Sequence, residues 1–309
     1  MTTDAATTAT QGMTRRAWTL FAAMAVIWGI PYLFIKIAVA EISPVAVAGW
    51  RTLLGAAILL PLAARAGALR PALRAWRYVV AFGVIEMALP WVLLGHAETR
   101  VPSGFAGLML AAVPIVGTVL SWLLGDHHAL SRVRLVGLAV GVIGVAALVG
   151  LDWAAGTIDA LSVAELLVVA VGYAVAPAIA ARKLSHVPSM GVVSVSLAFV
   201  ALLYLPASLS SIRSGLPSGQ VVLSVLVLAL VCTALAFVLF FELIAEAGPV
   251  RATVITFVNP AVAVALGVMV LAEPLTWGTL VGFPLVLLGS YWATRGPVSA
   301  DEPAEPAPS

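Results

Sequence analysis

Ten apolar segments, each about 20 residues long and separated by short polar breaks, make up most of this chain. A helix of that length spans the hydrocarbon core of a bilayer. Because lipid offers no hydrogen bonds, each segment must satisfy its own backbone polar groups, which favours helices. We therefore predict an all-α integral membrane protein with ten transmembrane helices. The segments are residues 17–38, 44–64, 77–97, 102–123, 132–151, 162–182, 189–209, 220–242, 249–271 and 276–294.

The composition supports a membrane protein and excludes several other classes. Apolar residues make up 62% of the 309 residues and charged residues only 10%, whereas soluble domains carry about 25% charged residues. A net charge of +2 gives no argument for nucleic-acid binding. The single cysteine, Cys232, excludes an intramolecular disulfide and a cysteine-built metal site, and we predict that it is a small buried residue.

The second half of the chain repeats the first at a constant offset of 146 residues. Residues 237–270 align with residues 91–124 without a gap, and both stretches have the same order of apolar segment, polar break and second apolar segment. The identical pairs are Val92/Val238, Leu93/Leu239, Ala106/Ala252, Pro114/Pro260, Val116/Val262 and Leu120/Leu266. This shared order indicates a duplicated unit.

The duplication divides the chain into four parts. We predict a polar N-terminal segment, two five-span repeats, and a charged, proline-rich tail that is disordered. These parts are residues 1–16, 17–151, 152–295 and 296–309.

The Lys and Arg residues predict how the chain is oriented, because cytoplasmic loops are enriched in them. With the N-terminus inside, twelve of the 16 lie in cytoplasmic breaks and four lie outside. The twelve are Arg15, Arg16, Arg65, Arg70, Arg74, Arg77, Arg132, Arg134, Arg182, Lys183, Arg251 and Arg295, and the four are Lys36, Arg51, Arg100 and Arg213. We predict a multi-pass protein of the cell membrane with both termini cytoplasmic.

Five spans per repeat is an odd number, so the second repeat must cross the membrane upside down relative to the first. Inverted repeats are typical of secondary transporters, whose binding site lies near the middle of the membrane where the repeats meet. The topology therefore favours a transporter that works by alternating access.

Four passages resemble the drug/metabolite transporter superfamily, of the EamA-like ten-span type. They are Trp28-Gly29 with Lys36, Trp50-Arg51, residues 88–107 and residues 258–276. The resemblance covers roughly residues 17–295 and implies export or exchange of a small metabolite, such as an amino acid, without ATP.

Glu86 is the most informative single residue, because it lies near the middle of the third segment. A carboxylate at that depth costs about 2.5–3.5 kcal/mol on insertion scales. Such a residue suits substrate binding or proton coupling in a wet cavity. The alternative is a protonated glutamate that bonds to a neighbouring helix for packing.

The first segment carries Trp28, Tyr32 and Lys36 four residues apart, which places them on one helical face. This face fits a cavity wall, with Lys36 as a contact for a substrate anion. The alternatives are packed aromatic rings and a Lys36 side chain that reaches the outer headgroups.

The ninth segment carries Thr253, Thr256 and Asn259 on one face. Asn259 fits either substrate binding or a hydrogen bond that holds two helices together. Tyr173 in the sixth segment and Trp91 in the third complete the predicted cavity. The predicted substrate-binding residues are Trp28, Tyr32, Glu86, Trp91, Tyr173, Thr256 and Asn259.

Several other features predict structure. Gly137, Gly141 and Gly144 make a close-packing helix face. Asp126 and Glu273, which lie in breaks, fit helix caps or loop anchors, and the neighbouring His127-His128 pair is a weak candidate for a metal site.

No motif for an enzyme is present. The chain lacks the phosphate-binding G-x-x-x-x-G-K-[ST], the zinc-binding H-E-x-x-H and the nucleophile turn G-x-S-x-G. We predict no catalytic residue, metal or cofactor, and the partners are a small-molecule metabolite and the lipid bilayer, not nucleic acid. The main alternative is an integral-membrane enzyme that acts on a lipid-borne substrate, and a receptor or scaffold is a further one.

Overall fold

A computed structural model describes residues 13–125, 132–213, 215–248 and 252–294. Within these ranges the chain forms helices and short connections, and no strand. The α-helices are α1 (Arg15–Ile27), α2 (Pro31–Ala38), α3 (Pro44–Arg65), α4 (Leu69–Arg74), α5 (Trp76–Gly83), α6 (Leu89–Glu98), α7 (Ser103–Leu110), α8 (Val113–Leu123), α9 (Arg132–Ala154), α10 (Ala160–Lys183), α11 (Ser189–Arg213), α12 (Gly219–Leu226), α13 (Ala236–Ala247), α15 (Asn259–Leu271) and α16 (Trp277–Thr294). Two π-helices, η1 (Val84–Ala88) and η3 (Val227–Leu235), and a 3-10 helix, η4 (Thr253–Phe257), lie between them.

Nine stretches of the described chain are long and apolar enough to cross a membrane. They begin and end within a few residues of the first nine predicted segments, so these segments are confirmed as long apolar helices. The tenth predicted segment is also helical, as α16, but it is not among the nine. The protein is thus an all-helical, multi-pass membrane protein, with nine candidate spans among the described residues.

Capping side chains fix where several helices begin. Thr14 Oγ1 accepts a hydrogen bond from Ala17 N (3.0 Å) before α1, and Ser43 Oγ accepts one from Ala46 N (3.2 Å) before α3. Each cap satisfies a backbone donor that the first turn of a helix leaves unpaired. Pro44 follows the second cap at the first helical position, where its missing N–H costs nothing.

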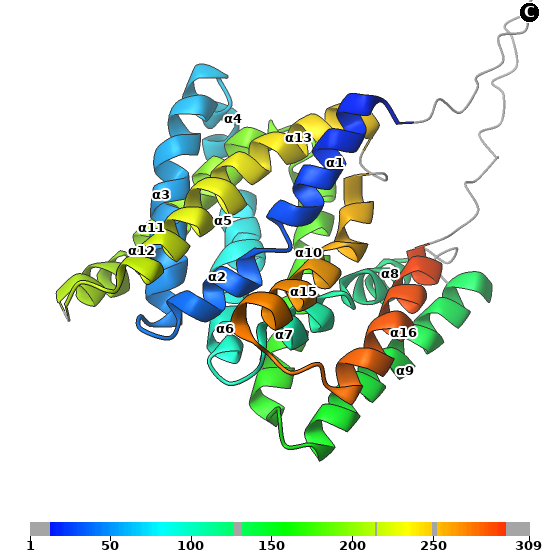
Figure 1. Cartoon of the computed structure of the whole chain (residues 1–309). Helices are drawn as coiled ribbons and strands as arrows, with labels where there is room; N and C mark the ends of the chain where they lie inside the picture. The colour runs from blue at the N-terminus through cyan, green and yellow to red at the C-terminus, as the bar shows by residue number, and fades with distance from the viewer. Residues whose placement is uncertain (1–12, 126–131, 214, 249–251, 295–309) are drawn as a thin grey trace, which may run out of the picture.

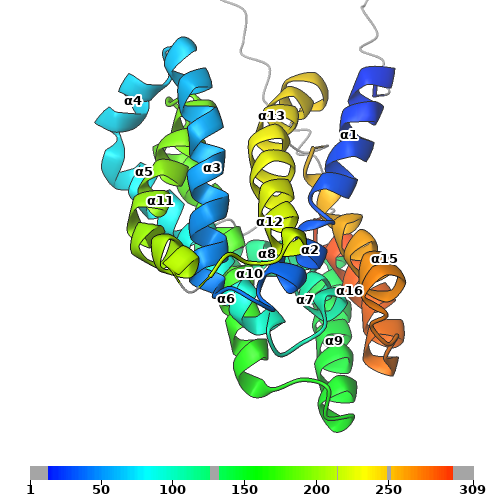
Figure 2. The same ribbon diagram turned by 60° about the vertical axis from the view of Figure 1, so that its left-hand side comes forward.

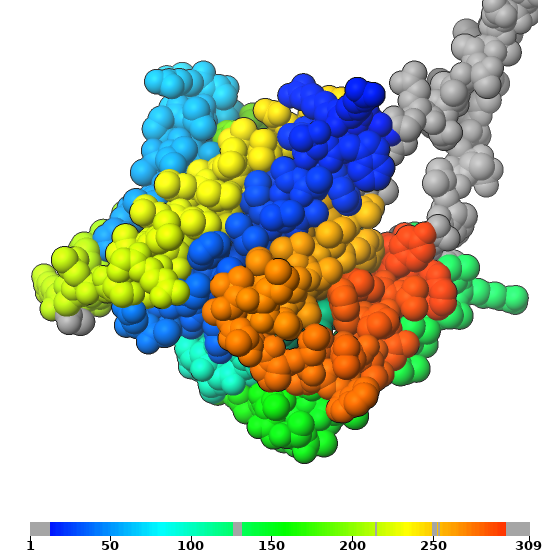
Figure 3. All heavy atoms as spheres, viewed as in Figure 1, coloured from blue at the N-terminus to red at the C-terminus, as the bar shows by residue number. Residues whose placement is uncertain are grey.

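Connections at the two ends of the molecule can be followed in Figures 1 and 2. The starts of α1 and α4 and the end of α13 lie at one end, which we call the upper end. The α6–α7 connection and the α9–α10 connection lie at the opposite, lower end. From the same view, the space-filling surface of α1, α13 and α15 is continuous (Figure 3).

Close helix packing joins the first half of the chain to the second. Helices α9 and α16 run side by side, and a Cβ atom added to Gly289 of α16 would lie 2.2 Å from Gly141 N of α9. Because no side chain fits at that separation, glycine is required there. The predicted close-packing role of Gly137, Gly141 and Gly144 is confirmed, since an added Cβ at each would collide with α16 or with Ile115.

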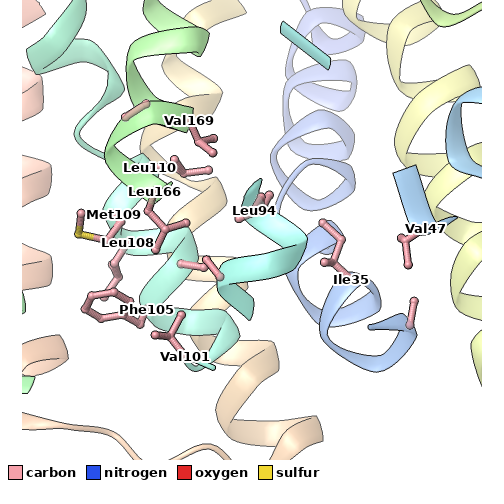
Figure 4. Packing of buried hydrophobic residues seen from close by; sticks show 14 of the residues in the cluster. Ile35, Val47, Leu94, Val101, Phe105, Leu108, Met109, Leu110, Leu166 and Val169 are labelled. Atoms are coloured by element: carbon pink, nitrogen blue, oxygen red, sulfur yellow. The ribbon is translucent and has the colours of Figure 1, made fainter. Parts of the chain in front are cut away.

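The largest buried apolar cluster lies toward the lower end. Most of its buried members come from α2, α6, α7 and α10, and Figure 4 labels Ile35, Leu94, Phe105 and Leu166 from these helices. Phe105 and Leu166 are at most 2% exposed. This cluster fills the interior between the cavity described below and the lower end.

Candidate functional site

A cavity of about 880 Å³ lies among the helices of both halves. The structure brings all seven predicted substrate-binding residues to its wall. They are Trp28, Tyr32, Glu86, Trp91, Tyr173, Thr256 and Asn259. A cavity of this size accommodates a metabolite or drug-sized molecule.

Interruptions in the helices surround the cavity. The first span is broken between α1 and α2 at Trp28, the fourth between α7 and α8 beside Pro114, and the ninth between η4 and α15 at Asn259. Irregular backbone inside a membrane protein is tolerated where it is buried or lines a cavity. Discontinuous helices of this kind form the binding sites of many secondary transporters.

Glu86 lies in η1, a π-helical turn between α5 and α6. Its Oε2 atom is buried and has no hydrogen-bond partner among the described residues. Gly172 of α10 packs against this turn, because a Cβ added there would lie 2.7 Å from Ile85 O. π-helical turns are rare and occur frequently at functional sites. The backbone around Glu86 therefore departs from a regular helix where the carboxylate borders the cavity.

The second half has a π-helix at the matching place. Cys232 follows Glu86 by the repeat offset of 146 residues, lies within η3 and also lines the cavity. Cys232 is 1% exposed, so the prediction that it is a buried residue is confirmed. The two halves thus present a carboxylate and a thiol at equivalent positions.

Arg51 lines the cavity, although its place near the start of the second segment predicts an outside charge. It lies two turns inside α3, and its guanidinium stacks on Trp91 with Cζ 3.7 Å from the ring centroid. Arg51 Nε donates to Thr233 Oγ1 of η3 (2.8 Å), and Nη2 lies 3.4 Å from Cys232 O. An arginine this deep in an apolar segment was a signal in the sequence, because the span begins seven residues earlier.

Aromatic side chains form much of the remaining wall. Trp28 packs against Phe240 with ring centroids 4.6 Å apart and against Phe237 at 6.1 Å. Tyr32 lies against Gly107 of α7, where an added Cβ would be 3.7 Å from the tyrosine ring. This wall can bind an apolar or aromatic body.

Asn259 was predicted either to bind substrate or to hold two helices together, and its hydrogen bonds fit the second role. With its amide nitrogen facing acceptors, Nδ2 donates to Ala25 O (3.0 Å) and Ile255 O (2.9 Å). Asn259 therefore holds α1 against η4 while it also borders the cavity.

Lys36 is not part of the cavity wall. Its Nζ donates to Glu98 O (2.5 Å) and Val101 O (2.8 Å) at the α6–α7 connection. The side chain of Glu98 is fully buried, and neither carboxylate oxygen has a hydrogen-bond partner among the described residues. Lys36 thus ties the end of α2 to the lower end of the molecule.

Glu273 also closes the lower end. Its carboxylate accepts hydrogen bonds from Ser103 N (2.7 Å), Ser103 Oγ (3.0 Å) and Gly104 N (3.1 Å) at the first turn of α7. The prediction that Glu273 caps a helix is confirmed. Asp126, with its neighbours His127 and His128, lies outside the described residues.

A second polar network joins α6 to α10 at the lower end. Arg100 Nη2 donates to Glu165 Oε2 (2.6 Å), and His96 Nδ1 lies 2.6 Å from Glu165 Oε1. Because Glu165 is only 7% exposed, these contacts hold two helix ends together around a buried carboxylate.

The opposite end of the cavity has an exposed margin. Ser121, Leu124 and Arg182 line it there and are all exposed, whereas Leu94 and Leu110 at its other end are buried. Among the described residues, the cavity is therefore sealed toward the lower end and bordered by exposed residues at the other. No group of three or more His, Cys, Asp or Glu that could hold a metal ion occurs in the described part of the chain.

Comparisons with known proteins agree with this architecture. The chain is 30% identical over 293 residues to the uncharacterized inner membrane transporter YedA of Escherichia coli K12. The aligned region covers 90% of this chain and 92% of that protein. It is 26% identical over 289 residues to a probable amino-acid metabolite efflux pump of Salmonella typhimurium LT2, covering 90% of this chain and 95% of the pump. A solved crystal structure with 19% identity superposes with a TM-score of 0.62 over 90% of this chain and 96% of that one, which shows a shared fold.

The family itself is shown by a match to both halves. The model of the EamA-like transporter family matches residues 16–150 and again residues 161–295. The chain therefore belongs to the EamA-like transporter family, as the resemblance in its sequence indicated.

Proposed function

We propose that this protein is a secondary transporter that exports or exchanges a small metabolite, such as an amino acid, by alternating access between two inverted five-span halves. The observation that carries the proposal is the cavity, which is built at helix interruptions from both halves and sealed at one end only. A transporter in one of its two alternating states requires this geometry.

The inverted arrangement is supported by where two equivalent breaks lie. The break after α6 contacts Lys36, near the lower end of the first span, through Glu98 O and Val101 O. The break that begins at Glu246 contacts the upper end of that span, where Thr14 Oγ1 donates to Glu246 Oε1 (2.7 Å). Equivalent breaks at opposite ends of one span are expected if the second half is turned over.

The orientation follows from charge. Arg15, Arg16 and Arg65 lie toward the upper end, and cytoplasmic ends are enriched in arginine and lysine. We place the upper end and both termini in the cytoplasm, so the sealed lower end faces outward. In this state the cavity receives substrate from the cytoplasm, as export requires.

Glu86 is the candidate for proton coupling. It borders the cavity with one carboxylate oxygen unpaired among the described residues, so a substrate group or a proton can bind there. Exchange of the two would couple substrate movement to the proton gradient. Trp28, Tyr32, Trp91, Tyr173, Thr256 and Asn259 form the remainder of the proposed binding site.

Transport by purified protein in liposomes tests the proposal. We expect a panel of labelled small metabolites to contain compounds that cross the membrane faster with protein than through empty liposomes, and a saturating unlabelled excess to block them. The variant Gly117→Trp should abolish that flux, because Gly117 lines the cavity and nothing lies within 4 Å of a Cβ added there, so the indole ring has open space to fill. Flux at the rate of empty liposomes for every compound would contradict the proposal.

A further inference from the structure

Arg51 is a buried cation without a carboxylate partner. It is 7% exposed and lies on the cavity wall, and no salt bridge among the described residues includes it. A charged group buried in this way is costly unless an opposite charge approaches it. The cavity beside Arg51 is the space from which such a charge can come.

The contacts of Arg51 orient the guanidinium without neutralising it. Trp91 stacks on one face, Thr233 Oγ1 accepts from Nε, and Cys232 O lies near Nη2. Thr233 is itself fixed, because its hydroxyl donates to Leu228 O (2.8 Å) five residues earlier in the π-helix. All of these partners are neutral, so the positive charge is positioned but not compensated.

Arginine presents five N–H donors in a planar fork that matches a carboxylate. Two of the five have acceptors among the described residues, at Thr233 and Cys232. The aromatic wall formed by Trp28, Phe237 and Phe240 lines the same cavity. The site therefore combines an anion-binding group with a surface for an apolar body.

We infer that Arg51 anchors the anionic group of the transported molecule, which is a small organic carboxylate with an apolar or aromatic body. This inference rests on the proposed transport function and names the substrate class and a specificity-determining residue of the same cavity. Thr233 of the second half positions the guanidinium, so both halves contribute to recognition of the anion.

Matched acid and amide probes test the anchor. Benzoate, 3-phenylpropionate and L-phenylalanine are each paired with the corresponding amide, which keeps the shape and removes the negative charge. Binding to the purified full-length protein is measured by the thermal unfolding midpoint and by tryptophan fluorescence, to which Trp91 under Arg51 contributes. We expect at least one acid to bind about tenfold or more tightly than its amide, as a charge-assisted hydrogen bond provides.

Three variants assign that preference to Arg51. Arg51→Gln should remove the preference for the acid, Arg51→Lys should keep the charge but weaken acid binding, and Thr233→Val should weaken it without removing the charge. Arg213→Gln, which changes an exposed arginine on α11, is the matched control and should behave as wild type. If Arg51→Gln does not fold, Arg51→Lys and Thr233→Val still test the anchor.

Each outcome separates the anchor from the transport function. Amides that bind as tightly as their acids, no acid binding in any pair, or acid binding that Arg51 and Thr233 variants leave unchanged would overturn the anchor. Acid binding that needs Arg51, together with flux no faster than in empty liposomes, would instead refute transport and leave the anion site standing. Flux that is the same in the Arg51 variants as in wild type would refute only the role of Arg51 as the anchor.

Discussion

The Glu273 carboxylate accepts a hydrogen bond from Ser103 N at 2.7 Å, so a residue of the second half caps the first turn of α7 in the first half. Removing an N-cap costs about 0.5–2 kcal/mol. Because this cap exists only while the lower end is sealed in the proposed mechanism, its loss should favour the state that opens outward.

We predict that Glu273→Ala opens the lower end more often. A cysteine introduced at Val101, which is 0% exposed, should react several-fold faster with a membrane-impermeant maleimide added outside, in a Cys232→Ala background. Glu246→Ala is the matched control, because Glu246 accepts from Thr14 Oγ1 at the upper end. Equal labelling rates in the Glu273 and Glu246 variants would show that the cap does not hold the seal.

A second prediction concerns proton coupling at Glu86. Glu86→Gln keeps the shape of the side chain but cannot release a proton, so transport driven by a pH gradient should fall to its rate without a gradient. The measurement compares flux in liposomes with and without the gradient, and Glu242→Gln at the exposed upper end serves as the control. Unchanged proton dependence in Glu86→Gln would exclude this residue as the coupling site.

How far the sequence predicts the cavity can be judged at Glu86 and Arg51. Hydropathy located the helices because each span must be apolar over its whole length. Glu86 was detectable as a carboxylate in the middle of such a span. Arg51 was counted as a loop charge although it lies within the predicted segment. Counting Lys and Arg residues on each side of the membrane does not record how far along a span each residue lies.

The π-helices could not be predicted in this way. A π-helix leaves the apolar character of its segment unchanged, and the gapless alignment of the two halves begins only after η1 and η3, so the sequence gives no sign of either. Lys36 was expected either at an anion site or among the outer headgroups. Its Nζ instead binds two backbone carbonyls of the α6–α7 connection, contacts that no spacing of side chains reveals.

The third prediction is that Gly289→Ala destabilises the protein. An added Cβ would lie 2.2 Å from Gly141 N, so α9 and α16 must separate, and overpacking of this kind costs about 1–3 kcal/mol. Thermal unfolding in detergent should show a lower midpoint. Gly150→Ala in α9 is the control, because nothing lies within 4 Å of its added Cβ, and a midpoint equally lowered there would contradict the packing argument.

The fourth prediction is a pH dependence from Asp159, which lies just before α10. Asp159 Oδ1 accepts from Ser162 N (3.0 Å), and hydrogen bonds from Ser162 hold the pKa of this carboxyl below its usual value. Since the folded-state pKa is lowered, the stabilisation is present above the unfolded pKa of about 3.9 and is lost as the pH falls through the folded value.

Stability measured from pH 6 to pH 3, about two units above and one below that unfolded pKa, tests this. The wild type should lose stability relative to Asp159→Asn only at the acidic end of the range, because asparagine still caps the helix but does not titrate. A difference between the two proteins that stays constant across the range would refute the assignment.

The π-helical turn at Glu86 makes the shape of the site depend on a count of residues. A π-helical turn holds one residue more than an α-helical turn, so deleting one residue from Val84–Ala88 would restore regular winding while α5 and α6 keep nearly the same relative orientation. Trp91 would then keep its place over Arg51, whereas the widened turn that carries Glu86 would be lost. A one-residue deletion in this turn should therefore move Glu86 and leave the rest of the wall in place.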